Sequence, residues 1–141
     1  MILINTPSTA LQKAQNTILK ADTILTQFIA QRVYDDIPPN AVFPYVRIGD
    51  NQVIDDGNTC DVTPVEIYSK IHVWVRGPQR GIISDQICHL IQQALGTELV
   101  LEDYTVTVGH FMMTDTSDEQ NELELHSVIT FRYLIQENYV P

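Results

Sequence analysis

Four histidines and two cysteines are the side chains of this 141-residue sequence that could hold a metal ion or act as nucleophiles. No two of them have metal-ligand spacing, because the sequence contains neither H-x-x-x-H nor C-x-x-C. A G-x-S-x-G nucleophile turn is missing as well, and the glycines never cluster into a phosphate-binding loop. The sequence therefore predicts no catalytic residue, no metal and no cofactor, and we expect a protein that is not an enzyme. The six side chains are those of His72, His89, His110, His126, Cys60 and Cys88.

The cysteines and histidines also have plainer explanations. Cys88 lies on a predicted helix, where a small buried hydrophobe is the better interpretation. His89 follows it directly, but neighbours along a helix do not share a face, so the two do not form a pair. His72 and His126 fall on outward-facing positions of predicted strands and could be neighbours across a sheet, although ordinary polar strand residues are the commoner explanation. With only two cysteines, we expect a reducing compartment and no disulfide framework.

The acidic balance of the chain argues against binding to nucleic acid or to a membrane surface. Eighteen acids oppose eight bases, for a net charge of −10, whereas non-specific DNA binding depends on Lys and Arg neutralising phosphates. This charge does not exclude a surface that DNA slides past without binding. Five acids gather in a segment that we predict to be a polar loop, either simply solvated or a functional acidic surface. They are Asp115, Asp118, Glu119, Glu122 and Glu124.

Aromatic and basic side chains alternate along one face of the predicted strand at 65–76. Tyr68, His72 and Trp74 lie on this face, with Lys70 and Arg76 interleaved. The row either covers a second layer, such as the N-terminal helices, or forms a subunit interface, where Trp, Tyr and Arg are enriched. A stacking platform for nucleic acid is the weakest interpretation, because the chain is acidic.

Two helices are expected before residue 31. Apolar residues recur at helical spacing in the segment 7–30. Thr6 or Ser8 is the expected N-cap of the first helix, and Asp22 or Thr23 that of a second, shorter one. The first helix is expected to bury Leu11, Ala14, Ile18 and Leu19 and to expose Gln12, Lys13, Gln15 and Asn16.

The rest of the chain predicts four strands and one more helix. Strands are expected at 45–54, 65–76, 104–114 and 123–135, and a helix at 79–95. The element order α-α-β-β-α-β-β indicates an α+β fold with a mostly antiparallel four-stranded sheet and helices on one face, in a single domain over 1–141. Inward-facing positions alternate in the second and fourth strands. They are Val65, Ile67, Ile71, Val73, Val75, Leu123, Leu125, Ile129, Phe131, Tyr133 and Ile135.

The sequence offers no membrane or secretion signal. No apolar run approaches the roughly 20 residues that cross a bilayer. The first residues lack the basic and long apolar regions of a secretory signal peptide. We therefore expect no membrane partner.

One stretch, from Arg32 to Gly49, joins the helical and the sheet-forming parts of the chain. Two consecutive prolines end any helix there, and a third lies at the start of a strand, where a missing N–H costs least. This stretch resembles the tail completion, or tail terminator, proteins of long-tailed bacteriophages. The I-H-V-W-V-R run at 71–76 and the F-R-Y run at 131–133 extend the resemblance over nearly the whole chain. The motif residues of the first stretch are Val33, Tyr34, Asp35, Pro38, Pro39, Phe43, Pro44 and Tyr45.

The resemblance implies a structural role in the virion. Such proteins form a ring, commonly a hexamer, that caps the head-proximal end of the tail tube, ends its polymerisation and offers a surface to the head connector. The expected partners are further copies of the chain, the tail tube protein and the connector or stopper protein, with DNA passing through the ring. The expected location is the virion tail or neck, and the host cytoplasm during assembly.

The site residues follow from this role as expectations. The aromatic row of Tyr68, His72, Trp74 and Arg76 becomes a candidate subunit interface, and the five acids between 115 and 124 a candidate lumen lining or tube-facing loop. The motif around the prolines is expected to shape the fold. A head–tail connector or stopper protein is the alternative, followed by an unrelated ligand-binding α+β domain, which would need a deep pocket with convergent polar groups.

Overall fold

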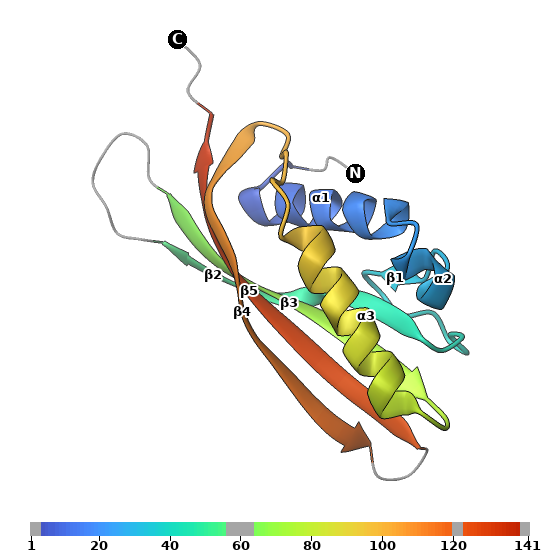
Figure 1. Cartoon of the computed structure of the whole chain (residues 1–141). Helices are drawn as coiled ribbons and strands as arrows, with labels where there is room; N and C mark the ends of the chain where they lie inside the picture. Colours follow the sequence, from blue (N-terminus) through green and yellow to red (C-terminus); the bar gives the residue numbers. More distant parts are fainter. Residues whose placement is uncertain (1–3, 56–63, 120–122, 139–141) are drawn as a thin grey trace.

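The computed structural model describes residues 4–55, 64–119 and 123–138. Within them, three helices pack on one face of a five-stranded sheet, and the other face carries no helix (Figure 1). The sheet order is β1-β2-β3-β5-β4. The elements are α1 Pro7–Ala21, α2 Leu25–Ile29, β1 Val33–Tyr34, β2 Tyr45–Asp55, β3 Val65–Arg76, α3 Arg80–Leu95, β4 Tyr104–Glu119 and β5 Glu124–Glu137.

The prediction of four mostly antiparallel strands was wrong in its count and in its element order. β1 adds a fifth strand, parallel to β2, with Val33 opposite Val46 and Tyr34 opposite Arg47, so the sheet is mixed. A two-residue strand is too short to show alternation in the sequence. Its pairing comes from tertiary contacts: the Val46 N–H donates to the Arg32 carbonyl at 3.0 Å, and Arg32 Nε donates to the Pro44 carbonyl at 2.9 Å.

The start of α1 follows a capping residue expected from the sequence, whereas the N-cap position of α2 is Ile24, which makes no side-chain capping bond. Thr6 Oγ1 accepts a hydrogen bond from the Thr9 N–H at 3.1 Å, which makes Thr6 the N-cap of α1. The carboxylate of Asp22 accepts from the N–H groups of Ile24 and Leu25 at 3.0 and 2.8 Å, just before α2. Each bond satisfies a backbone donor that a helix leaves unpaired at its first turn.

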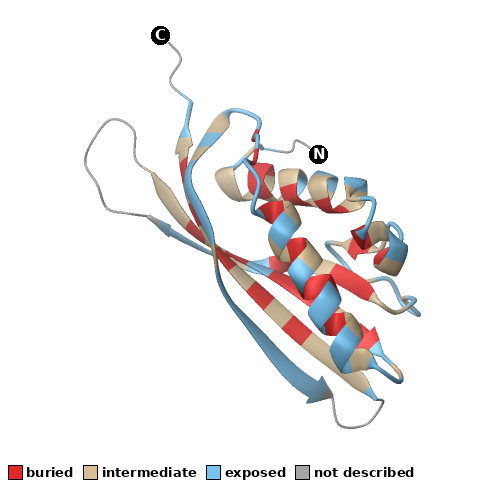
Figure 2. Ribbon diagram, viewed as in Figure 1, coloured by how far each residue is buried: buried red, intermediate tan, exposed pale blue. Residues whose placement is uncertain are grey.

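The core lies between the helices and the covered face of the sheet. Figure 2 shows buried positions along β3 and β5 wherever the chain faces the helices. The predicted alternation of both strands is confirmed with one exception, because Leu123 is 63% exposed at the hairpin turn, with a φ of 54°. Gln15, which we expected to be exposed, is fully buried, and its Nε2 donates to Ser69 Oγ at 2.9 Å.

The acidic segment forms strand rather than loop over most of its length. β4 continues to Glu119 and β5 begins at Glu124, so the predicted loop at 115–121 was too long. Thr116 pairs with Ser127 of β5, and their hydroxyl oxygens lie 3.0 Å apart. Polar residues suggested a loop, but pairing with β5 extends the strand. β4 is the edge strand and is exposed along most of its length (Figure 2).

Candidate functional site

The face of the sheet without helices carries a ladder of nearly parallel rings across β2, β3 and β5. Trp74 lies between Tyr45, with ring centroids 5.4 Å apart, and His126, at 4.2 Å and an interplanar angle of 4°. Phe43 lies beside Tyr45, with ring centroids 4.9 Å apart, but its ring is tilted by 56°. The family-like motif and the 71–76 strand therefore meet in one cluster. We call it the aromatic ladder, and it consists of Phe43, Tyr45, His72, Trp74 and His126.

The ladder changes the interpretation of the aromatic row. The helices lie on the opposite face, so the row does not cover them (Figure 1). His72 and Trp74 belong to the ladder, and the Arg76 guanidinium lies 4.2 Å from the Phe43 ring centroid. Tyr68 lies apart from the ladder, opposite Arg132, near the other end of β3. Three of the four candidate interface residues therefore form one surface, and the fourth does not.

His72 and His126 are neighbours across the sheet, as their outward-facing positions suggested. His72 Nδ1 lies 2.8 Å from His126 Nε2. The other ring nitrogen of His72, Nε2, lies 3.0 Å from Asp50 Oδ2, although its N–H is poorly aligned for a hydrogen bond. Asp50 also lies 3.4 Å from Arg47 Nη1. Sequence patterns did not point to Asp50, because a β-bulge brings it to this face.

The bulge lies in β2 between Gly49 and Gln52, where the register with β3 shifts. Asp50 has a φ of 58°, a left-handed conformation that Asp tolerates better than most residues. Bulges redirect side chains and recur near functional sites. Here the extra residue turns the Asp50 carboxylate towards His72.

Burial and neighbouring charges shift the pKa values of His72 and Asp50. Burial lowers the pKa of His72, the nearby His126 lowers it further, and Asp50 opposes the shift without reversing it. Burial alone would raise the pKa of Asp50, but Arg47 and His72 bring it below its usual value. Near neutral pH, His72 is therefore an uncharged imidazole facing a carboxylate.

The arginines of the open face each have a carboxylate partner. Arg132 Nη2 lies 2.7 Å from Glu66 Oε2, and Arg76 pairs with Glu124. With the pair of Arg47 and Asp50, three guanidinium groups are matched by three carboxylates. The middle of this face is therefore close to charge balance, although the chain as a whole carries a net charge of −10.

The five acids of the candidate lining do not form one surface. Register places Asp115 and Glu124 on the open face. Asp118 faces the helix side, with its Oδ1 3.9 Å from Arg80 Nε. The side chain of Glu119 and all of Glu122 lie outside the described residues.

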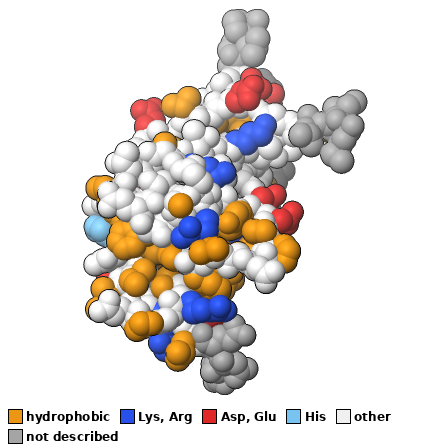
Figure 3. Space-filling view, turned by 90° about the vertical axis from the view of Figure 1, so that its right-hand side faces the viewer, with side chains coloured by type: hydrophobic (Ala, Val, Ile, Leu, Met, Phe, Trp, Pro, Cys, Tyr) orange, Lys and Arg blue, Asp and Glu red, His pale blue; other side chains and the backbone are white. Residues whose placement is uncertain are grey.

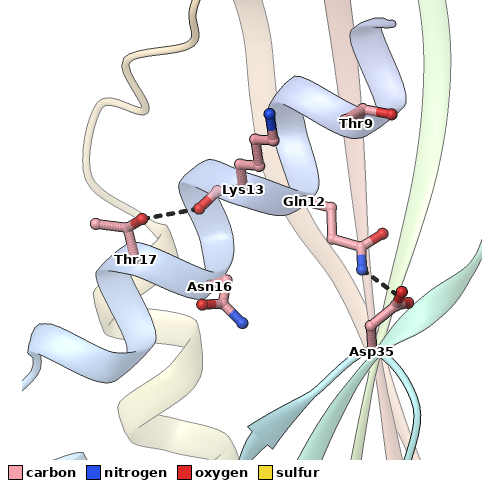
Figure 4. A pocket seen from close by; sticks show the side chains of 6 residues that line it. All are labelled: Thr9, Gln12, Lys13, Asn16, Thr17 and Asp35. Atoms are coloured by element: carbon pink, nitrogen blue, oxygen red, sulfur yellow. Dashed lines mark hydrogen bonds between the residues drawn. The ribbon is translucent and has the colours of Figure 1, made fainter. Parts of the chain in front are cut away.

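One hollow of the surface is shallow and polar. It measures about 490 Å³, lies along α1, and is lined by side chains that do not converge on one point (Figure 4). Gln12 Nε2 donates to Asp35 Oδ1 at 2.9 Å, and Thr17 Oγ1 donates to the Lys13 carbonyl at 3.0 Å. It differs from the deep pocket that a ligand-binding domain would need. Its lining residues are Thr9, Gln12, Lys13, Asn16, Thr17 and Asp35.

The described residues contain no group of three or more His, Cys, Asp or Glu side chains that could hold a metal ion. Cys88 is buried against Ser127 and Ser84, and burial raises the pKa of its thiol. The thiol is therefore poorly reactive, as the sequence suggested. Cys60 lies outside the described residues. None of the described helices is both long and apolar enough to span a bilayer.

A second surface is apolar. Figure 3 shows hydrophobic side chains gathered, with Lys and Arg among them, on the side of the molecule that carries α2. Ile24, just before α2, and Val42, just before β2, are 55% and 63% exposed. Exposed apolar side chains in a contiguous patch are typical of protein–protein contacts. The molecule thus presents surfaces suited to assembly.

Comparison with known proteins decides among the remaining explanations. A family model described as tail completion protein gp17 matches residues 16–136. The chain belongs to this family. It is a structural protein of phage tail completion and not an enzyme.

Two solved structures share the fold of this tail completion protein. A chain of the virion of a native gene transfer agent particle has a TM-score of 0.83 and 22% identity, over 92% of this chain and 96% of the other. The gp17 protein of bacteriophage SPP1 has a TM-score of 0.61 and 21% identity, over 94% of each chain. No curated protein matches the sequence.

Proposed function

We propose that this tail completion protein forms a closed, hexameric ring on the head-proximal end of the tail tube. The ring ends tube polymerisation and joins the tail to the head connector, and DNA passes through it. Family membership supports the role in tail completion, and the relative in a gene transfer agent virion supports assembly with other particle proteins. The structural observation that supports the ring proposal is that strand edges are left unpaired on both sides of the described sheet.

Both sides of the sheet offer strand edges to a neighbour. Among the described residues, no strand pairs with the outer edge of β4, and β1 covers β2 only at Val46 and Arg47. Unpaired edges of this length are templates for pairing with another chain. Both edges also carry exposed apolar side chains, between 38% and 53% exposed. They are Val53 and Ile54 on β2, and Val108, Met112 and Met113 on β4.

Strand directions favour a head-to-tail contact. β2, β3, β5 and β4 are successively antiparallel, so β4 runs opposite to β2. Rotation about an axis along the strands keeps these directions, so β4 of one copy would meet β2 of the next in an antiparallel pair. Two different surfaces in contact form a heterologous interface, which closes into a ring when the rotation per copy fits.

The charges suit a channel for DNA. Paired guanidinium groups on the open face offer little attraction to phosphate, and the net charge opposes non-specific binding. The acids of the β4–β5 hairpin stay our candidates for the lumen lining or the tube-facing surface. Replacing Asp115 on the open face with Lys should slow DNA ejection, and replacing Asp85 on α3 with Lys is the matched control. Unchanged ejection and assembly would reject the role.

Cross-linking tests the ring contact directly. In a Cys60→Ser background, the double variant Gln52→Cys and Met113→Cys places thiols at exposed positions of β2 and β4. In the presence of tubes of the cognate tail tube protein, a short bismaleimide should then produce a series of cross-linked oligomers that ends at the hexamer. The single variants should give no species above a dimer.

A pair of exposed positions on α3, Gln86→Cys and Gln93→Cys, is the matched control. If this control gives the same series of cross-linked oligomers as the β2 and β4 pair, the edge contact is rejected. A hexamer detected by light scattering without any cross-link between the edges would also reject it. The aromatic ladder with Tyr68 and Arg76 would then be the interface to test, with a thiol at Lys70. If tail tubes stop growing even when the protein is absent, the capping role itself is rejected.

A further inference from the structure

We propose that the short strand β1 acts as a register stop between neighbouring copies of the chain. It ends strand pairing along β2, so that segment 113–119 of β4 in one copy lies opposite segment 48–55 of β2 in the next. This alignment rests on the edge contact of the proposed ring, which by itself leaves the two strands free to slide past each other.

β1 closes the first part of the β2 edge. It pairs with Val46 and Arg47, so a strand from another copy cannot occupy that side of β2 there. At one end of β1, the Val46 N–H donates to the Arg32 carbonyl at 3.0 Å. At the other end, Arg47 Nε donates to the Asp35 carbonyl at 3.1 Å. Hydrogen bonds thus tie both ends of β1 to β2.

β1 also offers little to a further strand on its own outer side. Along a strand, the backbone groups of successive residues point to opposite sides. The Arg32 carbonyl bonds to β2, so the backbone of Val33 points outwards, and its N–H donates to the Gln31 carbonyl at 2.9 Å. A two-residue strand whose outward donor is already bonded is a poor template for pairing. Pairing with another copy is therefore confined to segment 48–55 of β2.

The edge of β4 is regular only in its last part. Its register with β5 shifts twice, and the second shift lies between Phe111 and Met113. Such bulges bend a strand and interrupt its pairing. Segment 113–119 follows the last bulge and pairs with β5 without a break. It is therefore the part of β4 best suited to a partner strand, and its length is close to that of segment 48–55.

The stop limits how far the two strands can slide. In an antiparallel contact, the C-terminal end of β4 points towards the start of β2, where β1 lies. Sliding forward in that direction drives the end of β4, at Glu119, into β1, and sliding back shortens the overlap. The longest overlap that stays clear of β1 is favoured, because each added residue pair satisfies backbone groups that an open edge leaves unpaired.

Apolar side chains select one alignment among those that the stop allows. Side chains alternate between the two faces of a sheet, so alignments that keep the faces differ in steps of two residues. With Met113 opposite Ile54, two side chains that are 46% and 38% exposed cover each other on the open face. One step back would place Asp115 opposite Ile54, and one step forward would press the end of β4 against β1.

A fixed alignment also bears on the size of the ring. In a closed sheet, the number of strands, their tilt and their stagger are linked. A heterologous contact closes only when the rotation per copy fits. Because the stop is part of every copy, each contact receives the same stagger, which favours a single ring size.

Short-range cross-linking tests the alignment. In the Cys60→Ser background with tail tubes present, Ile54→Cys and Met113→Cys should lie directly opposite each other, with Cβ atoms about 4.5–5.5 Å apart. A reagent that bridges only such distances should link this pair several-fold faster than two shifted pairs on the same face. The shifted pairs combine Ile54→Cys with Asp115→Cys or with Ser117→Cys and are the matched controls.

The outcomes separate the stop from the ring. A shifted pair that reacts faster than the opposite pair overturns the stop and leaves the edge contact in place. Oligomers that form while none of the three pairs reacts reject the edge contact, and the stop with it. If no oligomer forms on the tubes, the proposed ring itself is rejected.

A weakened stop should let the strands slide forward. Arg32→Ala removes the 2.9 Å bond from Nε to the Pro44 carbonyl, one of the contacts that hold β1 in place. Faster hydrogen exchange at the Val46 N–H, which bonds to β1, reports the loosening. The short reagent should then gain reactivity with Gln52→Cys and Met113→Cys, which become opposite after one step forward.

Lys13→Ala, at an exposed position of α1, is the control and should change neither the exchange nor the cross-links. Loosening of β1 in Arg32→Ala without any gain for the forward pair would contradict the stop. If β1 does not loosen, or if the variant fails to fold, the relative rates of the three pairs in the otherwise unchanged chain decide.

Discussion

The two faces of the sheet are built on different physical principles, although they alternate residue by residue along the same strands. On the covered face, Ile67, Ile71 and Val73 of β3 are fully buried against helices. On the open face, the neighbouring side chains are held by stacked rings and paired charges. Apolar burial therefore stabilises the fold on one face, and directional contacts arrange a surface on the other. The predictions below test this contrast.

The largest effect is expected from shortening a core side chain on the covered face. Ile71→Ala removes a fully buried side chain and leaves a cavity, which should lower the free energy of unfolding by about 2–5 kcal/mol. Lys70→Ala, the exposed neighbour on the open face, should change it by less than about 0.5 kcal/mol. Urea unfolding of both variants gives the comparison. Similar losses of unfolding free energy in the two variants would contradict the idea that burial on the covered face provides most of the stability.

A polar residue inside the covered layer should matter more than its exposed neighbour. Gln15→Ala removes the hydrogen bond from α1 to Ser69 and leaves that buried hydroxyl without this partner, at a cost of about 1–3 kcal/mol. Lys13→Ala, on the exposed side of the same helix, is the control. Thermal unfolding by circular dichroism measures both. A loss in the control equal to that of Gln15→Ala would mean that the buried hydrogen bond does not account for the effect.

Acid should weaken the protein through the open face. Because the pKa of His72 is lowered in the folded state, the unfolded chain binds more protons below about pH 6.5, and the free energy of unfolding falls as the pH drops. His72→Gln should flatten this decline, whereas His89→Gln should keep it. Urea unfolding across the range between about pH 7.5 and pH 5.5 measures the slopes. Parallel slopes in all three proteins would contradict the prediction.

Alkaline pH should lower the free energy of unfolding through a residue on the covered face. Burial raises the pKa of Tyr133 to about 12, so above about pH 10 the unfolded chain releases a proton that the folded chain keeps. The free energy of unfolding should therefore fall as the pH rises beyond that point. Tyr133→Phe should lose this part of the decline, and the ultraviolet absorbance of ionising tyrosines should lack its latest step. Tyr68→Phe, at a half-buried position on the open face, is the matched control.

The smallest effect is expected from an ion pair on the open face. Glu66→Gln removes the partner of Arg132 at 2.7 Å on a partly exposed surface, where salt screens the attraction. The unfolding midpoint should shift less than in the core variants Ile71→Ala and Gln15→Ala, and the shift should vanish in concentrated salt. A large, salt-independent loss would mean that paired charges also carry the fold.

The sequence was sufficient for features that depend on near neighbours. Alternation in β3 and β5 identified the covered face, since inward side chains of a half-buried strand recur every second residue. Thr6 was identifiable as the cap of α1, and Asp22 as an acceptor for backbone N–H groups near the start of α2, because the bonds they make span two or three residues. The motif around Pro38, Pro39 and Pro44 indicated the family without any knowledge of contacts.

Tertiary structure decided what depends on distant partners. β1 exists because Val33 and Tyr34 meet β2, and two residues carry no periodic signal. Gln15 is buried because Ser69, 54 residues away, offers its hydroxyl. Asp50 reaches His72 only because a bulge turns the chain there. Local sequence patterns determine which way a side chain points along a strand or helix. Which partner it contacts depends on how the strands and helices pack together, and this packing determined the contacts on the open face.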